Sequence, residues 1–112
     1  MSVSFDAFSS FDVTALRLTL NVYDLSLKYN ELDYDQRTAY IEYIQDEFAP
    51  MDDEYSDIVD ACVLSLYQHQ KREDLEHCVM NLTKRFDVDK MDHVVQAMLE
   101  YADDFLSSRT WE

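Results

Sequence analysis

The chain of 112 residues contains no glycine, and this absence excludes several kinds of site and fold. An average composition would give about eight glycines in a chain of this length. The phosphate-binding loops of Walker-type and dinucleotide-binding proteins depend on glycine, so neither can be built here. Tight β-hairpins are disfavoured as well, because their turns need residues with positive φ. The sequence therefore indicates neither a nucleotide-dependent enzyme nor a sheet made of hairpins.

Long apolar runs and cysteines are also scarce. No stretch of about eighteen consecutive apolar residues occurs, which argues against a membrane-spanning helix. Residues 1–11 carry no basic side chain and no sustained apolar run, so they do not have the features of a secretory signal. We therefore expect a cytoplasmic protein, in which Cys62 and Cys78 are free thiols.

Basic residues are few, and the charge balance is strongly acidic. Nine Lys and Arg stand against 24 Asp and Glu, which gives a formal net charge of −15. Neutralising phosphates requires clusters of Lys and Arg, so direct binding to nucleic acid is not expected. Residues 31–60 hold eleven acids against one base, Arg37, for a local net charge of −10. Such a concentration sets the potential over a surface and points to a basic protein as the partner.

Apolar and aromatic residues, by contrast, are abundant. The composition is 47% hydrophobic, with eight Tyr, six Phe and one Trp. This is enough to form a core without a metal ion or a disulfide, and it sets the chain apart from disordered acidic sequences. We predict a single helical domain over residues 1–112, in which residues 1–11 form a short helix or a partly ordered arm.

The periodicity of the apolar residues predicts an all-α fold, a compact single-domain bundle of about five helices with no sheet. The second helix ends before Pro50, and the third begins near Asp52 or Asp53. If the third helix continued without interruption, its later apolar residues would lie on the side opposite its first apolar stripe. We therefore predict a turn within residues 68–74. The last helix is capped by Asp87 or Asp89.

Capping residues mark the ends of the first two helices. Asp12 is suited to cap a helix that begins at Val13, and Asn30 can take the left-handed conformation after its last turn. Asp33 and Gln36 have the spacing of a capping box at the start of the second helix. Two antiparallel helices joined within residues 68–74 would also bring Cys62 and Cys78 to a similar height, where they could be neighbours.

The helix of residues 13–29 carries two apolar stripes on roughly opposite sides. The first stripe consists of Val13, Leu16, Leu20, Tyr23 and Leu27. The second consists of Leu18, Val22, Leu25 and Tyr29. A helix that is apolar on two sides is either the centre of its own bundle or shared with another chain. We therefore assign the second stripe as the alternative face for a homodimer.

The acidic block is predicted to be a partner-binding surface. In the second helix, Tyr34, Ile41, Ile44 and Phe48 form the predicted core stripe, which leaves Tyr40 and Tyr43 as candidates for exposure. Tyrosine is enriched among the residues that dominate binding at interfaces. The predicted partner-binding residues are Asp35, Tyr40, Glu42, Tyr43, Asp46, Glu47, Asp52, Asp53, Glu54, Asp57 and Asp60.

No catalytic, metal or cofactor site is predicted. The residues with zinc-ligand chemistry are Cys62, His69, His77, Cys78 and His93, and no pair has the short spacing of a zinc site. A calcium loop is not expected at residues 87–92 either, because Met91 occupies a ligand position and the turn glycine is missing. Helix capping is the better explanation for the acids there.

Two functions fit these properties. In the first, the protein is a small acidic inhibitor that covers the basic, nucleic-acid-handling surface of a partner. It would act as an immunity protein or antitoxin against a nuclease toxin, or as a viral DNA mimic of the anti-restriction or anti-CRISPR type. In the second, it is a dimeric helical adaptor or structural module whose acids serve solubility. An enzyme is not expected.

Overall fold

Five α-helices make up nearly all of the chain that the computed structural model describes, which is residues 10–68 and 72–109. They are α1 (Ser10–Glu31), α2 (Tyr34–Phe48), α3 (Asp53–Gln68), α4 (Arg72–Arg85) and α5 (Val88–Arg109). These ranges contain no strand, so the predicted all-α bundle is confirmed. None of the described helices combines the length and the apolar character needed to cross a lipid bilayer.

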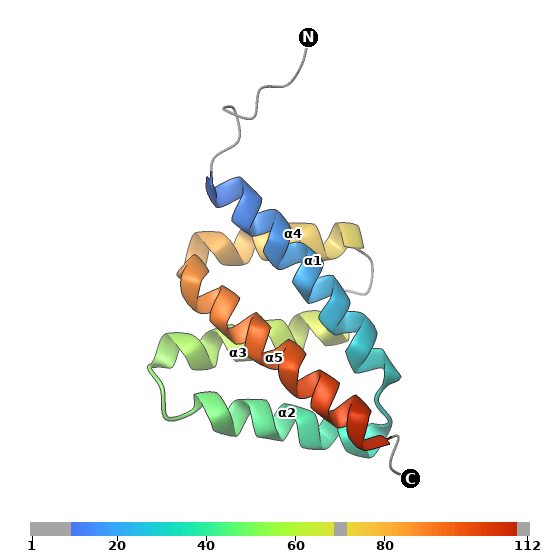
Figure 1. The fold of residues 1–112 in the computed structure, drawn as a ribbon. Helices are drawn as coiled ribbons and strands as arrows, with labels where there is room; N and C mark the ends of the chain where they lie inside the picture. The colour runs from blue at the N-terminus through green and yellow to red at the C-terminus, as the bar shows by residue number, and fades with distance from the viewer. Residues whose placement is uncertain (1–9, 69–71, 110–112) are drawn as a thin grey trace.

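The helices form two layers (Figure 1). α2, α3 and α4 lie side by side and alternate in direction, while α1 and α5 cross over them at an angle. α1 contacts α4 and α5, and α5 also contacts α2 and α3. The core lies between the layers. Each helix contributes at least one fully buried side chain, for example Leu18, Tyr40, Ile58, Leu75 and Met98.

α1 and α5 run in the same direction, although they are the first and last of the described helices. Two ion pairs join them, one between Arg17 and Asp92 at 3.5 Å and one between Lys28 and Asp103 at 2.6 Å. The residues of each pair are 75 positions apart, so the two helices keep the same register over three turns. The hydrogen bond to Asp103 also raises the pKa of Lys28.

Most of the predicted helix boundaries are confirmed. Asp33 and Gln36 form the capping box, with the Gln36 backbone N–H donating to Asp33 Oδ1 at 2.8 Å and the Asp33 N–H donating to Gln36 Oε1 at 3.0 Å. Asp87 Oδ1 accepts from the backbone N–H groups of Asp89 and Lys90, which makes Asp87 the cap of α5. The helices α3 and α4 end and begin within the predicted turn region, residues 68–74.

The predicted ends of the first helix are wrong. α1 begins at Ser10, so Asp12 lies inside the helix instead of capping it. No described residue has a positive φ, so Asn30 does not take the left-handed conformation. Instead, the Arg37 side chain donates to the carbonyl groups of Tyr29 and Asn30, which satisfies acceptors at the end of α1. Of the predicted N-terminal arm, residues 1–9 lie outside the described chain.

Burial also reverses the two stripes of α1. The predicted dimer face is core: Leu18 and Leu25 are fully buried, and Val22 and Tyr29 nearly so. These side chains pack against other helices of the same chain, so they cannot meet a second copy. The other stripe is largely exposed, with Leu16 at 51% and Leu20 at 42%.

The two cysteines are free thiols on facing sides of α3 and α4. Cys62 is buried, and the Sγ of half-buried Cys78 lies 2.9 Å from the hydroxyl of Ser65, one turn after Cys62. Burial, with a smaller contribution from Cys78, raises the pKa of Cys62 to about 12. The predicted proximity of the two cysteines therefore agrees with the structure.

Candidate functional site

One row of carboxylates runs along α2. Asp35, Glu42 and Asp46 are exposed, while Ile44 and Phe48 on the other side of the helix are buried. Positions 35, 42 and 46 lie within about 40° of one another around the helix axis, and about 10 Å and 6 Å separate them along it. They form a straight ridge that points away from the core. We call these three side chains the α2 ridge.

A second row runs along α3. Asp53, Asp57 and Asp60 are exposed, and the opposite side of the helix carries buried Ile58 and Cys62. The spacing of four and three residues keeps these acids on one side. We call Asp53, Asp57 and Asp60 the α3 ridge.

The two ridges are neighbours. α2 and α3 are antiparallel and in contact, and the Gln45 side chain reaches across to Asp60 at 3.5 Å. Packed helices have axes about 8–10 Å apart, so the two rows of carboxylates lie about one helix diameter from each other. Within the described residues, no salt bridge ties a ridge carboxylate to a cation. The ridges therefore present their charge to solvent.

An aromatic notch lies beside the α2 ridge, where α2 meets α5. The rings of Tyr43 and Tyr101 pack edge to face with their centroids 4.5 Å apart, and Phe105 lies behind them. Tyr43 is 40% exposed and, with Tyr101, Asp104 and Phe105, lines a cavity of about 200 Å³. A hydrogen bond with Tyr101, together with partial burial and the charge of Glu47, raises the pKa of Tyr43 to about 12. Tyr43 is thus a neutral, partly exposed contact beside acids.

Sequence reasoning missed the contribution of α5 to this notch. Tyr101 and Asp104 are three residues apart and therefore lie near one another on the helix surface, but neither was among the predicted site residues. The one available signal was a tyrosine followed by two acids, Asp103 and Asp104. That signal does not tell which other helix lies beside it.

Tyr40 is not part of the exposed surface, and its prediction as a partner contact is wrong. Its side chain is 0% exposed, and its hydroxyl donates to the backbone carbonyl of Met98 at 2.9 Å. Burial raises its pKa. Tyr34, which was predicted to be core, is 81% exposed. The bundle therefore uses Tyr40 where the sequence pattern placed Tyr34, because α5 covers the side of α2 on which Tyr40 lies.

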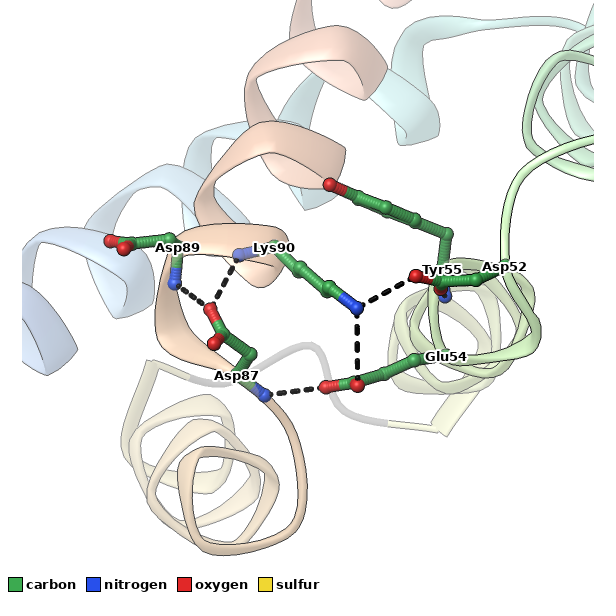
Figure 2. Close-up of polar contacts among 6 residues, drawn as sticks. All are labelled: Asp52, Glu54, Tyr55, Asp87, Asp89 and Lys90. Atoms are coloured by element: carbon green, nitrogen blue, oxygen red, sulfur yellow. Dashed lines mark hydrogen bonds and ion pairs between the residues drawn. The ribbon is translucent and has the colours of Figure 1, made fainter.

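Two of the predicted acids, Asp52 and Glu54, have a structural role at the start of α3 (Figure 2). Lys90 Nζ lies 2.7 Å from Asp52 Oδ2 and 3.4 Å from Glu54 Oε1. The other Glu54 oxygen accepts from the backbone N–H of Asp87 at 2.7 Å. Asp52 Oδ1 accepts from the N–H of Tyr55, so it also caps α3. We call this group of contacts the Lys90 junction.

The junction changes the ionisation of its members in the direction expected for an ion pair. The hydrogen bond to Lys90 lowers the pKa of Asp52, and the bond to Asp52 raises the pKa of Lys90. The Lys90 ammonium also lies 5.2 Å from the centre of the Tyr55 ring. Asp52 and Glu54 therefore hold the start of α3 against α5. The predicted set that remains available is Asp35, Glu42, Tyr43, Asp46, Glu47, Asp53, Asp57 and Asp60.

Several other reactive side chains of the described residues lie between α3 and α4. A cavity of about 360 Å³ between α3 and α4 is lined by, among others, Ser65, His77 and Cys78. The Ser65 hydroxyl donates to the carbonyl of Ala61, four residues earlier in the same helix. This hydrogen bond is common for serines within helices. Among the described residues, no group of three or more His, Cys, Asp and Glu could hold a metal ion.

No family model, curated protein or solved structure matches this chain. Its function has to be inferred from its own residues.

Proposed function

We propose that the protein is a small acidic inhibitor that binds and blocks the basic, nucleic-acid-handling surface of a partner protein. The observation that carries this proposal is the pair of adjacent ridges on α2 and α3, whose carboxylates face solvent without an ion-pair partner among the described residues. The partner would be a nuclease toxin or another nucleic-acid-binding protein in the cytoplasm. The protein would act by occupancy, without catalysis and without a cofactor.

The geometry suits this role because a basic surface binds phosphates as separated points of negative charge. The ridges offer such points, about 6–10 Å apart along each helix and in two parallel rows. Their summed field would attract a basic partner from a distance and increase the association rate.

The ridges are also held rigidly, which lowers the entropy that binding would cost. Tight packing of Ile44 and Phe48 fixes α2, and the Lys90 junction fixes the start of α3. A surface that is already ordered loses less conformational freedom on association than a flexible acidic tail would. Tyr43 adds apolar contact area next to the charge.

The test is a charge reversal on the ridges. A variant with Glu42→Lys, Asp46→Lys and Asp57→Lys should keep its helical content but lose at least about 100-fold in affinity for the protein partner that the wild type captures from nuclease-treated lysate. That partner, once purified, should bind duplex DNA or RNA, and the wild type should displace the nucleic acid in a stoichiometric manner.

The matched control carries Glu73→Lys, Asp89→Lys and Glu100→Lys, which changes the net charge by the same amount away from the ridges. Glu73 and Asp89 lie in first helical turns, so the control is expected to perturb the fold more than the ridge variant does. Capture that survives ridge reversal, or a captured protein that has no affinity for nucleic acid, would show that the proposal is wrong.

The exposed stripe of α1 favours a second candidate function, that of a helical adaptor. Val13, Leu16, Leu20 and Leu27 are each between 42% and 59% exposed, which is unusual for one side of a single helix. In this case the ridges would serve solubility. The association rate with a partner discriminates the two functions, because only ridge-driven binding should slow strongly as salt rises from about 50 to 500 mM.

A further inference from the structure

α1 repeats one spacing on both of its sides. The buried stripe uses Ala15, Leu18, Val22, Leu25 and Tyr29. The other stripe uses Val13, Leu16, Leu20 and Leu27, which are exposed, together with Tyr23, which is half-buried. Both follow steps of three and four residues in alternation, which is the spacing of a coiled-coil seam. α4 and α5 cover the first seam. The second, which we call the outer seam, extends over about 21 Å and is left largely open by the other described helices.

Charges on the edge of the outer seam define how a second copy would pair with it. Arg17 and Asp24 lie seven residues apart on the same edge, the one that faces α5. Two antiparallel copies of α1 related by a two-fold axis bring equivalent edges together. If Leu16 packs against Leu27 of the second copy and Leu20 against Tyr23, the heights of Arg17 and of Asp24 from the second copy differ by about 3 Å. Because of the two-fold symmetry, the pair of Arg17 and Asp24 occurs twice in the dimer.

We propose that the outer seam of α1 is a self-association surface, on which a second copy of this chain packs α1 against α1 in antiparallel orientation, with Leu16 opposite Leu27 and Arg17 opposite Asp24. The Arg17 side chain is 56% exposed and makes one contact with Asp92 at 3.5 Å. A guanidinium has five N–H donors, so it can keep that contact and also reach Asp24 of the second copy.

A hollow at the other edge of the outer seam fits an incoming leucine. It has a volume of about 250 Å³ and lies between α1 and α4, with Leu16, Thr19 and Met80 among its lining residues. Leu27 of the second copy, which the register places opposite Leu16, would enter here as a knob enters a hole. The hollow therefore extends the apolar contact beyond the two helices themselves.

The charge distribution permits this pairing despite the net charge of −15. The basic residues of α1, Arg17 and Lys28, lie on the seam's α5 edge and pair with the acids Asp92 and Asp103 there. The acidic ridges lie on the other layer of the bundle, on sides of α2 and α3 that point away from the core. A dimer through α1 would leave both sets of ridges exposed, so self-association and ridge binding are independent.

Sedimentation equilibrium between about 5 and 500 μM tests the proposal. The wild type should show a reversible dimer, and Leu20→Glu should shift its dissociation constant by more than about 100-fold, because each copy would bury an unpaired carboxylate against Tyr23 of the other copy. Leu64→Glu is the matched control, since Leu64 is 51% exposed on α3, away from the seam. It should leave the dimer unchanged. Circular dichroism should show the same helical content in all three proteins.

Mixing experiments test the register. Arg17→Asp and Asp24→Arg should each weaken the homodimer about tenfold, because two attractive pairs become repulsive. An equimolar mixture of the two variants should form a heterodimer of wild-type affinity. In that heterodimer the introduced aspartate of one variant meets the introduced arginine of the other, and the remaining native Asp24 and Arg17 meet at the second contact. A parallel pairing predicts no such rescue.

Three results would overturn the inference. A wild type that remains monomeric at 500 μM removes it, and deletion of residues 1–9 then distinguishes two reasons. If the shortened chain dimerises, residues 1–9 cover the seam in the full chain; if it does not, the seam is not a self-association surface. A dimer that Leu20→Glu leaves intact uses a different surface. A dimer that the mixture fails to restore does not have the antiparallel register.

Discussion

The outer face of α1 and the outer faces of α2 and α3 are built on the same helical geometry but present opposite chemistry. On α1, the outer side is a line of exposed leucines with one exposed valine and one half-buried tyrosine; on α2 and α3, it is a line of exposed carboxylates. Their opposite sides are alike, because each packs leucine, isoleucine, valine or tyrosine into one core. The contrast shows that the bundle buries one side of each of these helices in its core and leaves the other side exposed, where it can contact other molecules. The chain therefore offers two distinct surfaces.

The comparison depends first on which stripe of α1 is buried, and this gives the largest expected effect. Leu25→Glu places a charge at a position with no exposed surface, so it should cost more than about 4 kcal/mol of unfolding free energy and unfold a marginal domain. Leu20→Glu, five residues earlier, should change that free energy by less than about 0.5 kcal/mol. Urea unfolding followed by circular dichroism measures both. Equal losses of unfolding free energy in the two variants would show that one stripe is not buried while the other is exposed.

The second prediction concerns the two tyrosines of α2 that mark its inner and outer sides. Tyr40→Ala should lose about 3–5 kcal/mol, because it removes a fully buried ring and its hydrogen bond to Met98. Tyr40→Phe keeps the ring and should lose about 1 kcal/mol. Tyr34→Ala should be neutral to within about 0.5 kcal/mol. Denaturant midpoints measured at pH 7 rank the three variants by stability. A Tyr34 variant that is as unstable as the Tyr40 variant would contradict the assignment of sides.

Sequence predicted the helix ends where one residue determines the local chemistry, as at the Asp33–Gln36 capping box and at Asp87. It failed where the answer depends on a distant helix. Tyr34 and Tyr40 are both candidates for the core when α2 is taken alone, and the position of α5 decides between them. The stripes of α1 were equally apolar, so only the packing of α4 and α5 could choose one. Asn30 was misassigned because Arg37, a residue of the next helix, satisfies the carbonyls there.

The candidate site follows the same rule. All six ridge acids were among the residues predicted for the acidic surface, and all six are exposed. That Asp52 and Glu54 belong to a structural junction could not be predicted, since Lys90 is 36 residues or more away in the chain. Whether the ridges bind a basic partner stays a prediction.

The smallest effect is expected from removing the positive charge of Lys90. This change tests whether Asp52 and Glu54 stabilise the fold, in contrast to the ridge acids. The pKa of Asp52 in the folded protein lies below its ordinary value of 3.8, so its contribution to stability is present above that pH and is lost as pH falls through the lower folded value. The pKa of Lys90 lies above 10.5, so its contribution is present below that pH and is lost as pH rises through the higher folded value.

Lys90→Met should therefore lower the melting temperature slightly on the plateau between about pH 5 and 9, and flatten its fall at both ends. Lys84→Met, at an exposed lysine of α4, is the control and should keep the wild-type profile. Melting temperatures measured from pH 3 to 11 test this. A Lys90 variant whose profile is superimposable on the wild type would show that the junction does not stabilise the fold.

The direct contact between α1 and α5 has a consequence for how the chain folds during synthesis. α1 leaves the ribosome before α5, and the helix that covers much of the buried stripe of α1 is made about 60 residues later. Leu18, Leu25 and their neighbours remain uncovered in the meantime, and closing the core requires contacts across most of the chain length. We expect a folding transition that is slow for an all-helical domain of this size, because contacts between distant residues slow folding. A nascent chain that ends before α5 would expose the part of the buried stripe that α5 covers, together with the outer seam.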